Sequence, residues 1–210
     1  MLNEVYNFLF YRPIFKFLDW SFSLFKDFGF SIFLLTFLLK IFLFPLSVKM
    51  QKEQKKMEII SQKLREIRKQ YKDNKEEMIK KTMEFLKNEK INPLASYLLI
   101  LVQLPIFFAI FHSLKEFSLK KLPLFLGVLD LTKPNFSLAV LAGIFQYLQT
   151  ASTNSFQIMI SLFTSLFLII IFSQLPAALS LYLLFMIFFN FIERLIFSKF
   201  FENGGKIKRN

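Results

Sequence analysis

The longest stretch without a charged side chain runs from Pro134 to Ile192 and covers 59 residues. About 20 helical residues cross the bilayer core, so this stretch is too long for one span. Polar clusters at 150–157 (TASTNSFQ) and 173–176 (SQLP) divide it. In lipid, a single segment satisfies its backbone only as a helix, which predicts an all-α membrane protein here. The three predicted spans cover 135–151, 157–173 and 177–197.

Two further spans are predicted before this stretch. Residues 28–48 carry one charge, Lys40, and residues 93–114 carry none, although Pro105 lies among them. The sequence therefore predicts five transmembrane helices in all.

The segment 49–92 differs in character, with 14 Lys or Arg against 8 Asp or Glu. Apolar residues recur three or four positions apart on both sides of KDN (72–74), as expected for two helices with one apolar stripe each. These residues are Met57, Ile60, Leu64, Ile67 and Tyr71, then Ile79, Met83 and Leu86. We predict an antiparallel helical hairpin outside the membrane.

Residues 1–27 predict an amphipathic helix that lies in the membrane interface. Polar residues follow Pro13 at spacings of 3, 4 and 3, opposite a set of apolar residues, and Trp20 is expected at headgroup level. The polar stripe is Lys16, Asp19, Ser23 and Lys26, and the apolar face is Ile14, Phe17, Leu18, Phe22 and Phe25. A core helix on the aqueous side is the alternative. We expect no signal peptide at this end.

The distribution of basic residues predicts the orientation of the spans. The hairpin carries a net charge of +6 and the segment from Glu193 onwards carries +3, whereas residues 1–27 carry none. We therefore expect the hairpin and the basic tail (198–210) in the cytosol, and the N-terminus and the loop 115–134 outside. That loop carries a net +2, which fits this orientation less well.

Lys40 is the unusual residue of the first span. At 1.5 Å per residue it lies roughly 13 Å from the cytosolic end, where an unpaired charge costs several kcal/mol. We expect no acidic partner for it within the spans, because the long stretch from Pro134 to Ile192 and the spans 28–48 and 93–114 contain no Asp or Glu. A water-filled pocket that is open to the cytosol and closed to the outside would accommodate this charge. A pore-lining or merely tolerated lysine is the alternative.

Other polar side chains of the spans are expected in their cytosolic half, like Lys40. Thr36 lies one helical turn from Lys40, and Gln103 lies at a similar depth. Further candidates to line the pocket are Gln146, Ser161, Thr164 and Ser165. Hydrogen bonds between helices are the alternative role for the polar side chains of this half. We expect His112 to serve packing rather than function.

The composition excludes several kinds of chemistry. The chain has no cysteine, one histidine and only five glycines, and no glycine-rich phosphate-binding loop. We therefore expect no disulfide, metal site or cofactor, no nucleotide hydrolysis and no enzymatic activity. The net charge of +12 favours contact with anionic lipids or RNA.

Several segments, in this order, make the chain similar to the YidC-type membrane protein insertases, which have mitochondrial and chloroplast relatives. These segments include FGFSIFLLTFLLKIFLFPLS in the first span and LPAALSLYLLFMIFFNFIE in the last. The most specific, taken together, are EFLKNEKINPL, QLPIFFA and DLTKPNFSLAVLAG. The resemblance implies five spans around a cytosol-open hydrophilic groove, as in the short bacterial form. It also implies that Thr36 and Lys40 are groove residues. The family's groove charge is typically Arg, and Lys40 lacks the two-pronged geometry of a guanidinium.

From the residues and the resemblance together, we predict a membrane insertase and chaperone of the bacterial plasma (inner) membrane. Its expected partners are nascent membrane proteins, the ribosome, the signal recognition particle receptor, the Sec translocon and anionic lipids, with no specific nucleic acid sequence. A small transporter or channel, and a chaperone that only assembles inserted helices, are the alternatives.

Overall fold

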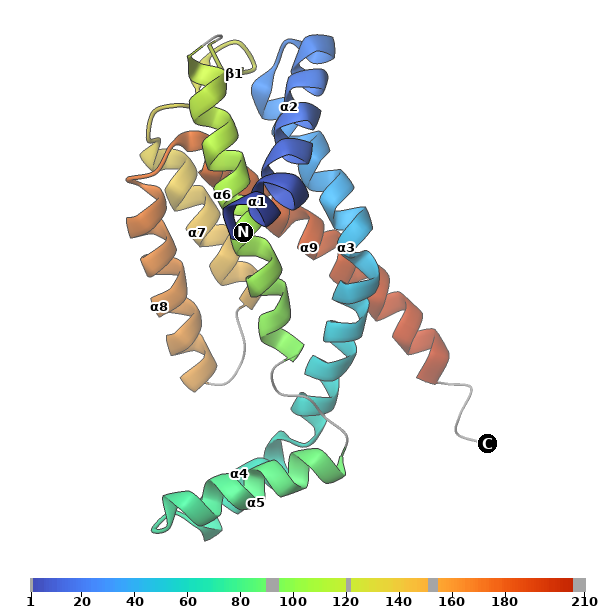
Figure 1. The fold of residues 1–210 in the computed structure, drawn as a ribbon. Coiled ribbons are helices and arrows are strands. Elements are labelled where there is room, and N and C mark those ends of the chain that lie inside the picture. The colour runs from blue at the N-terminus through green and yellow to red at the C-terminus, as the bar shows by residue number, and fades with distance from the viewer. Residues whose placement is uncertain (1, 90–94, 120–121, 151–154, 206–210) are drawn as a thin grey trace. The chain divides into compact units, whose positions relative to one another are not determined.

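The computed structural model describes residues 2–89, 95–119, 122–150 and 155–205, and the elements in them are almost all helical (Figure 1). The helices of the N-terminal half are α1 (Leu2–Tyr6), the π-helix η1 (Asn7–Tyr11), α2 (Arg12–Phe25), α3 (Phe28–Ile59), α4 (Ser61–Gln70), α5 (Lys75–Asn88) and α6 (Ala95–Ser118). Strands β1 (Leu124–Phe125) and β2 (Leu129–Asp130) follow, then α7 (Phe136–Thr150), α8 (Ser155–Phe172) and α9 (Ala177–Gly205).

The chain divides into two compact units, each described by itself below. The first unit comprises Met1–Ile41 and Pro105–Asn210, and the second comprises Phe42–Leu104. The boundary falls inside α3 and inside α6. The all-α fold expected from the sequence is confirmed, with one two-stranded hairpin as the exception among the described residues.

The start of α3 is fixed by Asp27, a residue with two roles. Its Oδ1 atom accepts a hydrogen bond from the backbone N–H of Phe30 (2.7 Å), which caps the helix. Its Oδ2 atom accepts one from the backbone N–H of Leu126 (2.5 Å) in the turn between β1 and β2. Leu126 and Gly127 both have positive φ angles (53° and 71°), the conformation of a type I′ turn. The Asp27 contact thus holds Leu126 in a conformation that leucine seldom adopts.

The segment after β2 satisfies the first backbone donors of α9, which have no partner inside their own helix. The N–H of Ala177 donates to Lys133 O (2.8 Å), and the N–H of Ala178 donates to Leu131 O (3.1 Å). Leu131, Ala177 and Ala178 are fully buried. Thr132 donates from its backbone and side chain to Asp130, and these bonds lower the pKa of the Asp130 carboxyl. This loop therefore fixes where α9 begins.

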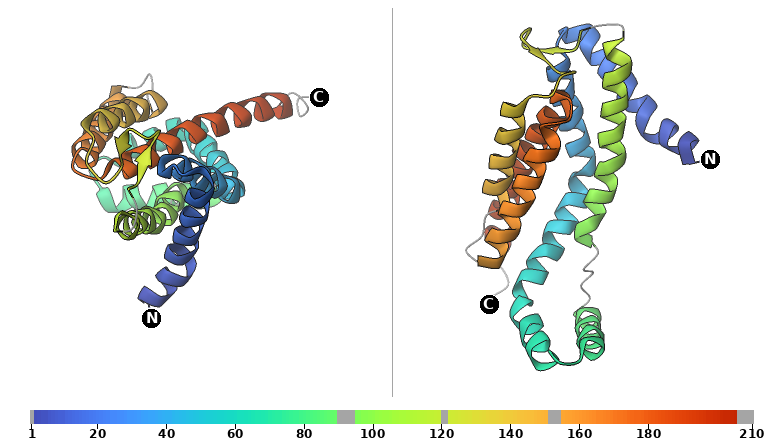
Figure 2. Two further views of the ribbon diagram at one scale, coloured as in Figure 1. Left: turned by 90° about the horizontal axis from the view of Figure 1, so that it is seen from above. Right: turned by 90° about the vertical axis from the view of Figure 1, so that its left-hand side faces the viewer.

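Helices α7 and α8 lie side by side and pack closely (Figure 2). Ala139, Ala142 and Gly143 form a buried strip of small residues on α7. A Cβ added at Gly143 would lie 2.3 Å from Cγ1 of Ile169 on α8, so the contact requires glycine. Small residues let helix backbones approach in this way inside membranes.

The N-terminal helix packs through aromatic rings of the first unit. The ring of Phe117 lies 5.0 Å from that of Phe22 and 4.8 Å from that of Phe28, measured between centroids. Ile14 and Leu18 of α2 are buried, and Trp20 is exposed. An amphipathic α2 is therefore present, while its position in the membrane interface stays a prediction.

Helices α4 and α5 of the second unit form a pair joined by a short turn. Leu64 and Leu86 are buried together, with Ile60 and Phe85 against them. Asn74 caps α5 by accepting from the N–H of Glu77 (3.2 Å), while Glu77 in turn accepts from the Asn74 amide. The cytosolic position of this hairpin stays a prediction.

One detail of the predicted hairpin is wrong. Ile79 and Met83 were expected to share the buried face of Leu86, but their exposed fractions are 56% and 55%. The less exposed face of α5 instead includes Met78, Thr82 and Phe85. Each of these precedes a residue of the predicted stripe by one position. On this face Phe85 packs against the buried pair Leu64 and Leu86, together with Ile60.

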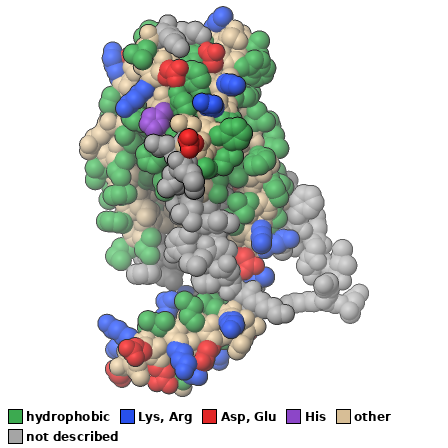
Figure 3. Space-filling view, in the orientation of Figure 1, with side chains coloured by type: hydrophobic (Ala, Val, Ile, Leu, Met, Phe, Trp, Pro, Cys, Tyr) green, Lys and Arg blue, Asp and Glu red, His purple; other side chains and the backbone are tan. Residues whose placement is uncertain are grey.

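Two segments of the described residues are long and apolar enough to cross a bilayer, Phe28–Glu53 and Ala177–Phe197. Two shorter apolar helices are Phe136–Thr150 and Ile158–Phe172. Hydrophobic side chains cover much of the surface seen in Figure 3, as a lipid-facing exterior requires. The predicted second span begins in 90–94, outside the described residues, so the number of five spans stays a prediction.

Candidate functional site

Lys40 lies at the end of an aromatic contact between α3 and α9. The ring of Phe33 lies 5.2 Å from that of Phe185 and 5.4 Å from that of Phe189, and the ring of Phe37 lies 5.7 Å from that of Phe189. Residues 33, 37 and 40 share one face of α3 because they are four and three positions apart. The next turn on this face therefore brings Lys40 to α9.

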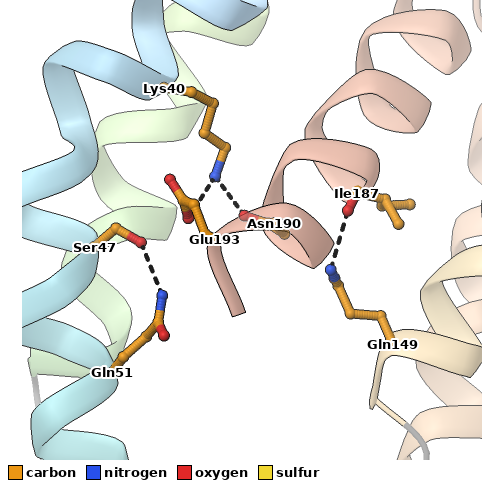
Figure 4. Close-up of polar contacts among 7 residues, drawn as sticks. All are labelled: Lys40, Ser47, Gln51, Gln149, Ile187, Asn190 and Glu193. Atoms are coloured by element: carbon orange, nitrogen blue, oxygen red, sulfur yellow. Dashed lines mark hydrogen bonds and ion pairs between the residues drawn. The ribbon is translucent and has the colours of Figure 1, made fainter. Parts of the chain in front are cut away.

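The Lys40 ammonium contacts two side chains of α9 (Figure 4). It donates to Oδ1 of Asn190, and it lies 3.3 Å from Oε2 of Glu193, within hydrogen-bonding and ion-pairing distance. The Lys40 and Glu193 side chains are only 11% and 9% exposed. The protein itself thus covers this charge pair almost completely.

The expectation that Lys40 has no acidic partner in the spans is wrong, because Glu193 is that partner. Glu193 follows the charge-free stretch by one residue and lies inside the apolar segment Ala177–Phe197. Lys40 is 12 residues from the start of α3, and Asn190 is 13 residues from the start of α9. At 1.5 Å per residue both lie about 18–20 Å along their helices, a match of depth that sequence periodicity alone does not reveal.

Thr36 and Gln103, the other predicted groove residues, are placed differently. Thr36 is fully buried, and its hydroxyl donates to the carbonyl of Ile32 (2.6 Å) one turn earlier in α3. Its hydroxyl is therefore already satisfied by its own helix. Gln103 is half-buried and belongs to the second unit, so its position relative to Lys40 is not described. The groove role of both residues stays a prediction.

The remaining predicted lining residues lie on α7 and α8. Ser161 and Ser165 are buried, Gln146 is half-buried and Thr164 is exposed. Ser161 donates to Thr150 O (3.0 Å), which links the end of α7 to α8. The Thr164 hydroxyl bonds to carbonyls of its own helix (3.0 Å), whereas the Ser165 hydroxyl has no partner among the described residues. These contacts fit the alternative of helix–helix bonding for Ser161.

The sequence reasoning missed a second connection to α9, made by Gln149 of α7. Its amide donates to Ile187 O (3.2 Å), as Figure 4 shows, and its own carbonyl accepts from Arg194 (2.5 Å). Asn190 and Glu193 face α3, while Ile187 and Arg194 face α7. A sequence signal could have indicated Glu193. It follows Phe185 and Phe189 at a spacing of four residues, which places all three on one face of a helix.

Two cavities of the first unit do not include Lys40 in their lining. One of about 590 Å³ is almost wholly apolar, between α3, α7 and α9, and one of about 730 Å³ lies beside the N-terminal helix. The first is lined by Phe33, Leu141, Phe145, Leu148, Gln149, Leu184, Phe185, Ile187, Phe188 and Phe191. The second is lined by Tyr6, Asn7, Tyr11, His112, Lys115, Glu116, Ser118 and Leu119. The described residues contain no cluster that could hold a metal ion.

The second cavity contains polar contacts that join α1 and η1 to α6. The Tyr11 hydroxyl donates to Glu116, and the Tyr6 hydroxyl lies 3.1 Å from Nδ1 of His112. Burial and the neighbouring Glu116 carboxylate raise the pKa of Tyr11 to about 12. His112 is exposed, but it packs edge-on against both tyrosine rings. It therefore makes a packing contact at the surface, and the expectation that it has no further function stays a prediction.

The family and structural comparisons agree with one another. A family model described as "60Kd inner membrane protein" matches residues 20–204. A "Membrane protein insertase YidC" of Nitrosomonas europaea is 35% identical over 178 residues, which cover 81% of this chain and 29% of that protein. One of Francisella tularensis is 33% identical over 167 residues, covering 76% and 30%.

A solved structure, described as "Active YidC insertase crystal structure with the first transmembrane domain resolved", has a similar fold. Its TM-score is 0.71 at 23% identity, and the match covers 88% of this chain and 45% of that one. The chain spans about 30% of the length of the curated relatives that it matches.

Proposed function

Since this chain belongs to the 60Kd inner membrane protein family, we propose that it inserts newly made proteins into the bacterial inner membrane and assists their folding. The observation that carries the proposal is the Lys40 ammonium, which the protein covers between two long apolar helices. A charge at this depth is costly and is typically kept for function.

We propose that Lys40 lies in a hydrophilic groove that is open to the cytosol and closed to the outside. Thr36 and Gln103 would contribute to it, with Gln146, Ser161, Thr164 and Ser165 as further lining. Lys40 would hold an acidic or polar segment of the client while the adjoining apolar segment moves into lipid. A segment held there crosses only the outer part of the bilayer.

The two short apolar helices support this mechanism. Helices α7 and α8 have 15 and 18 residues, which corresponds to about 22 and 27 Å of helix. Both are shorter than the usual hydrocarbon core of about 30 Å, so the bilayer beside them would thin locally. A thinner bilayer lowers the barrier to moving a short polar segment across.

The driving force we propose is the client's own transfer from water to lipid, about 0.8 kcal/mol per buried CH₂ group. No nucleotide hydrolysis would be needed. The α4–α5 hairpin and the C-terminus would face the cytosol, where the hairpin could receive a chain from the ribosome or the signal recognition particle receptor. The Sec translocon and anionic lipids are the further partners we propose.

Protease protection tests the proposed function directly. A small, newly made membrane protein is added to proteoliposomes that contain only this chain, and the protected fraction is compared with that of empty liposomes. Protection well above the empty liposomes supports insertion. Equal protection would contradict insertion by this chain alone and would favour an assembly-only chaperone or an obligatory Sec partner. Leakage of small ions through the proteoliposomes would favour the channel alternative.

A further inference from the structure

The Lys40 ammonium is already occupied by a carboxylate of the same chain. Glu193 is the only acidic side chain of the described residues within ion-pairing distance of Lys40, and Asn190 supplies a neutral oxygen beside it. A client carboxylate would therefore have to compete with Glu193 for the same cation. We propose that Glu193 is a built-in competitor that sets which clients Lys40 accepts, an inference that rests on the proposed function.

The physical reason for such a competitor is the cost of an empty site. An ammonium that is covered by protein and has no counter-ion is strongly unfavourable. Glu193 keeps the site neutral while no client is present. Capture of a client carboxylate then exchanges one ion pair for another instead of forming a new pair from separated charges. The exchange costs little, but it gains less than pairing with a free cation would, so Glu193 lowers the preference of the Lys40 site for acidic over neutral segments.

The geometry allows the exchange to begin before Glu193 leaves. A lysine ammonium has three N–H donors, and in the described residues two of them are directed at Asn190 and Glu193. The third makes no hydrogen bond in the described residues, so it is the donor that an incoming oxygen would use. A client carboxylate can therefore bind first and displace Glu193 afterwards, while Asn190 keeps its contact and Lys40 is never left without a partner.

The neighbouring charge of α9 has a partner on another helix. Arg194 follows Glu193 directly, but its guanidinium donates to the carbonyl of Gln149 on α7. The ion pair between Lys40 and Glu193 thus links α3 to α9. The typical groove arginine could donate to a client and to an internal carboxylate at once, whereas the compact ammonium of Lys40 cannot bind either in a two-pronged manner.

Binding of two peptides tests the proposal. The probes are two synthetic apolar transmembrane peptides that differ only in one central residue, Asp or Asn, and carry a fluorophore. Their affinities are measured for the full chain in lipid nanodiscs. If Glu193 occupies Lys40 in about nine molecules of ten, Glu193→Gln raises the affinity for the Asp peptide about tenfold. The affinity for the Asn peptide is expected to stay within about twofold.

The controls separate competition from a structural role. Glu66→Gln makes the same chemical change at an exposed residue of α4, and it should alter neither affinity. Glu193→Asp keeps the charge on a shorter side chain, so it should give a smaller gain for the Asp peptide. The melting temperature of each variant is recorded in the same nanodiscs to show which variants fold. If Glu193→Gln does not fold, Glu193→Asp provides the test.

The outcomes are distinguishable from failure of the proposed function. If Lys40→Leu abolishes binding of the Asp peptide but neither Glu193 variant increases it, Lys40 is a client site and the competitor role is wrong. If Glu193→Gln raises both affinities equally, the effect is a general loosening of the helices, and the proposal is also wrong. If wild-type proteoliposomes protect no client at all, the proposed function itself fails.

Discussion

Nζ of Lys40 on α3 lies 3.3 Å from Oε2 of Glu193 on α9, although 153 residues separate them in the sequence. The contact continues the aromatic packing of Phe33 and Phe37 against Phe189 by one more turn. The pair thus contributes to the relative position of α3 and α9 along their axes. It also supplies both the charge and the counter-charge of the candidate site.

We predict that loss of one member of this pair destabilises the protein more than loss of both. Lys40→Met leaves a covered carboxylate without its cation, a change that typically costs about 3–5 kcal/mol. The double variant Lys40→Met and Glu193→Met removes both charges and should recover most of this loss. Thermal unfolding in one detergent measures the effect. Equal melting temperatures for the single variant and the wild type would contradict a stabilising pair.

The contact between Gly29 and Phe125 gives a steric prediction. A Cβ at Gly29 would lie 2.2 Å from Cδ2 and 2.7 Å from Cβ of Phe125, so the ring cannot simply rotate away. Gly29→Ala should destabilise by about 1–3 kcal/mol, the usual cost of overpacking. Adding Phe125→Ala should cost less than the two separate effects combined, because the clash with the ring atoms is then gone and only the contact with Cβ at 2.7 Å remains.

The control for this prediction is Gly127, which lies in the turn that follows Phe125. An added Cβ there meets nothing within 4 Å, but φ is +71°. Gly127→Asn should therefore have little effect, since asparagine accepts this conformation better than other residues. If Gly127→Asn were as harmful as Gly29→Ala, the steric explanation would be wrong.

The contact between Tyr11 and Glu116 predicts a sensitivity to high pH. Burial and the Glu116 carboxylate raise the pKa of Tyr11 from 10 to about 12 in the folded protein. A group whose folded pKa is raised contributes stability below its unfolded pKa and loses it as the pH rises through the folded value. The contribution is therefore complete below pH 10 and is lost between pH 10 and about 12.

Glu116→Gln should lower the pKa of Tyr11 towards its ordinary value and move this loss to lower pH. The ultraviolet absorbance of tyrosinate follows the titration, and Tyr11→Phe identifies the contribution of this residue. A pKa of Tyr11 that is the same in Glu116→Gln and in the wild type would show that the carboxylate has no such effect.

The helices were largely predictable because the sequence marks their ends. Helices α7 and α8 begin and end within two residues of the predicted spans, since the polar clusters at 150–157 and 173–176 interrupt the apolar run. The end of α3 was not predictable in this way. The change from apolar to charged residues near Lys49 indicates a change of surroundings, whereas the helix itself continues to Ile59 through Pro45.

The candidate site was predictable only in part. Lys40 was recognisable as the single charge in an apolar run, because the energetic cost of a charge in the membrane depends on its depth, which its position in the span indicates. Its partner depends on how two distant helices meet, and the spacing of Phe185, Phe189 and Glu193 marks a face of α9 but not the helix that packs against it. The same holds for Gly29, whose role depends on a turn almost 100 residues away. Thr36 and Lys40 lie on one face, as predicted, but the Thr36 hydroxyl bonds to its own helix.

The absence of cysteine makes the predicted orientation simple to test. Val128 and Lys72 are both exposed, and they lie in the segments predicted outside and in the cytosol. We expect a membrane-impermeant maleimide to label Val128→Cys on intact spheroplasts, and Lys72→Cys only after permeabilisation. Labelling in the opposite pattern would reverse the orientation.

The most direct measurement of the central claim compares insertion by wild type, Lys40→Leu and Lys40→Arg in proteoliposomes. Two clients are used, which differ only in whether their translocated segment is acidic or neutral. The account predicts that Lys40→Leu loses insertion of the acidic client about tenfold, equivalent to about 1.4 kcal/mol, while Lys40→Arg retains it. Insertion of the neutral client should change little. If Lys40→Leu inserts the acidic client as well as the wild type, the positive charge of Lys40 has no role in receiving clients, and the account is contradicted.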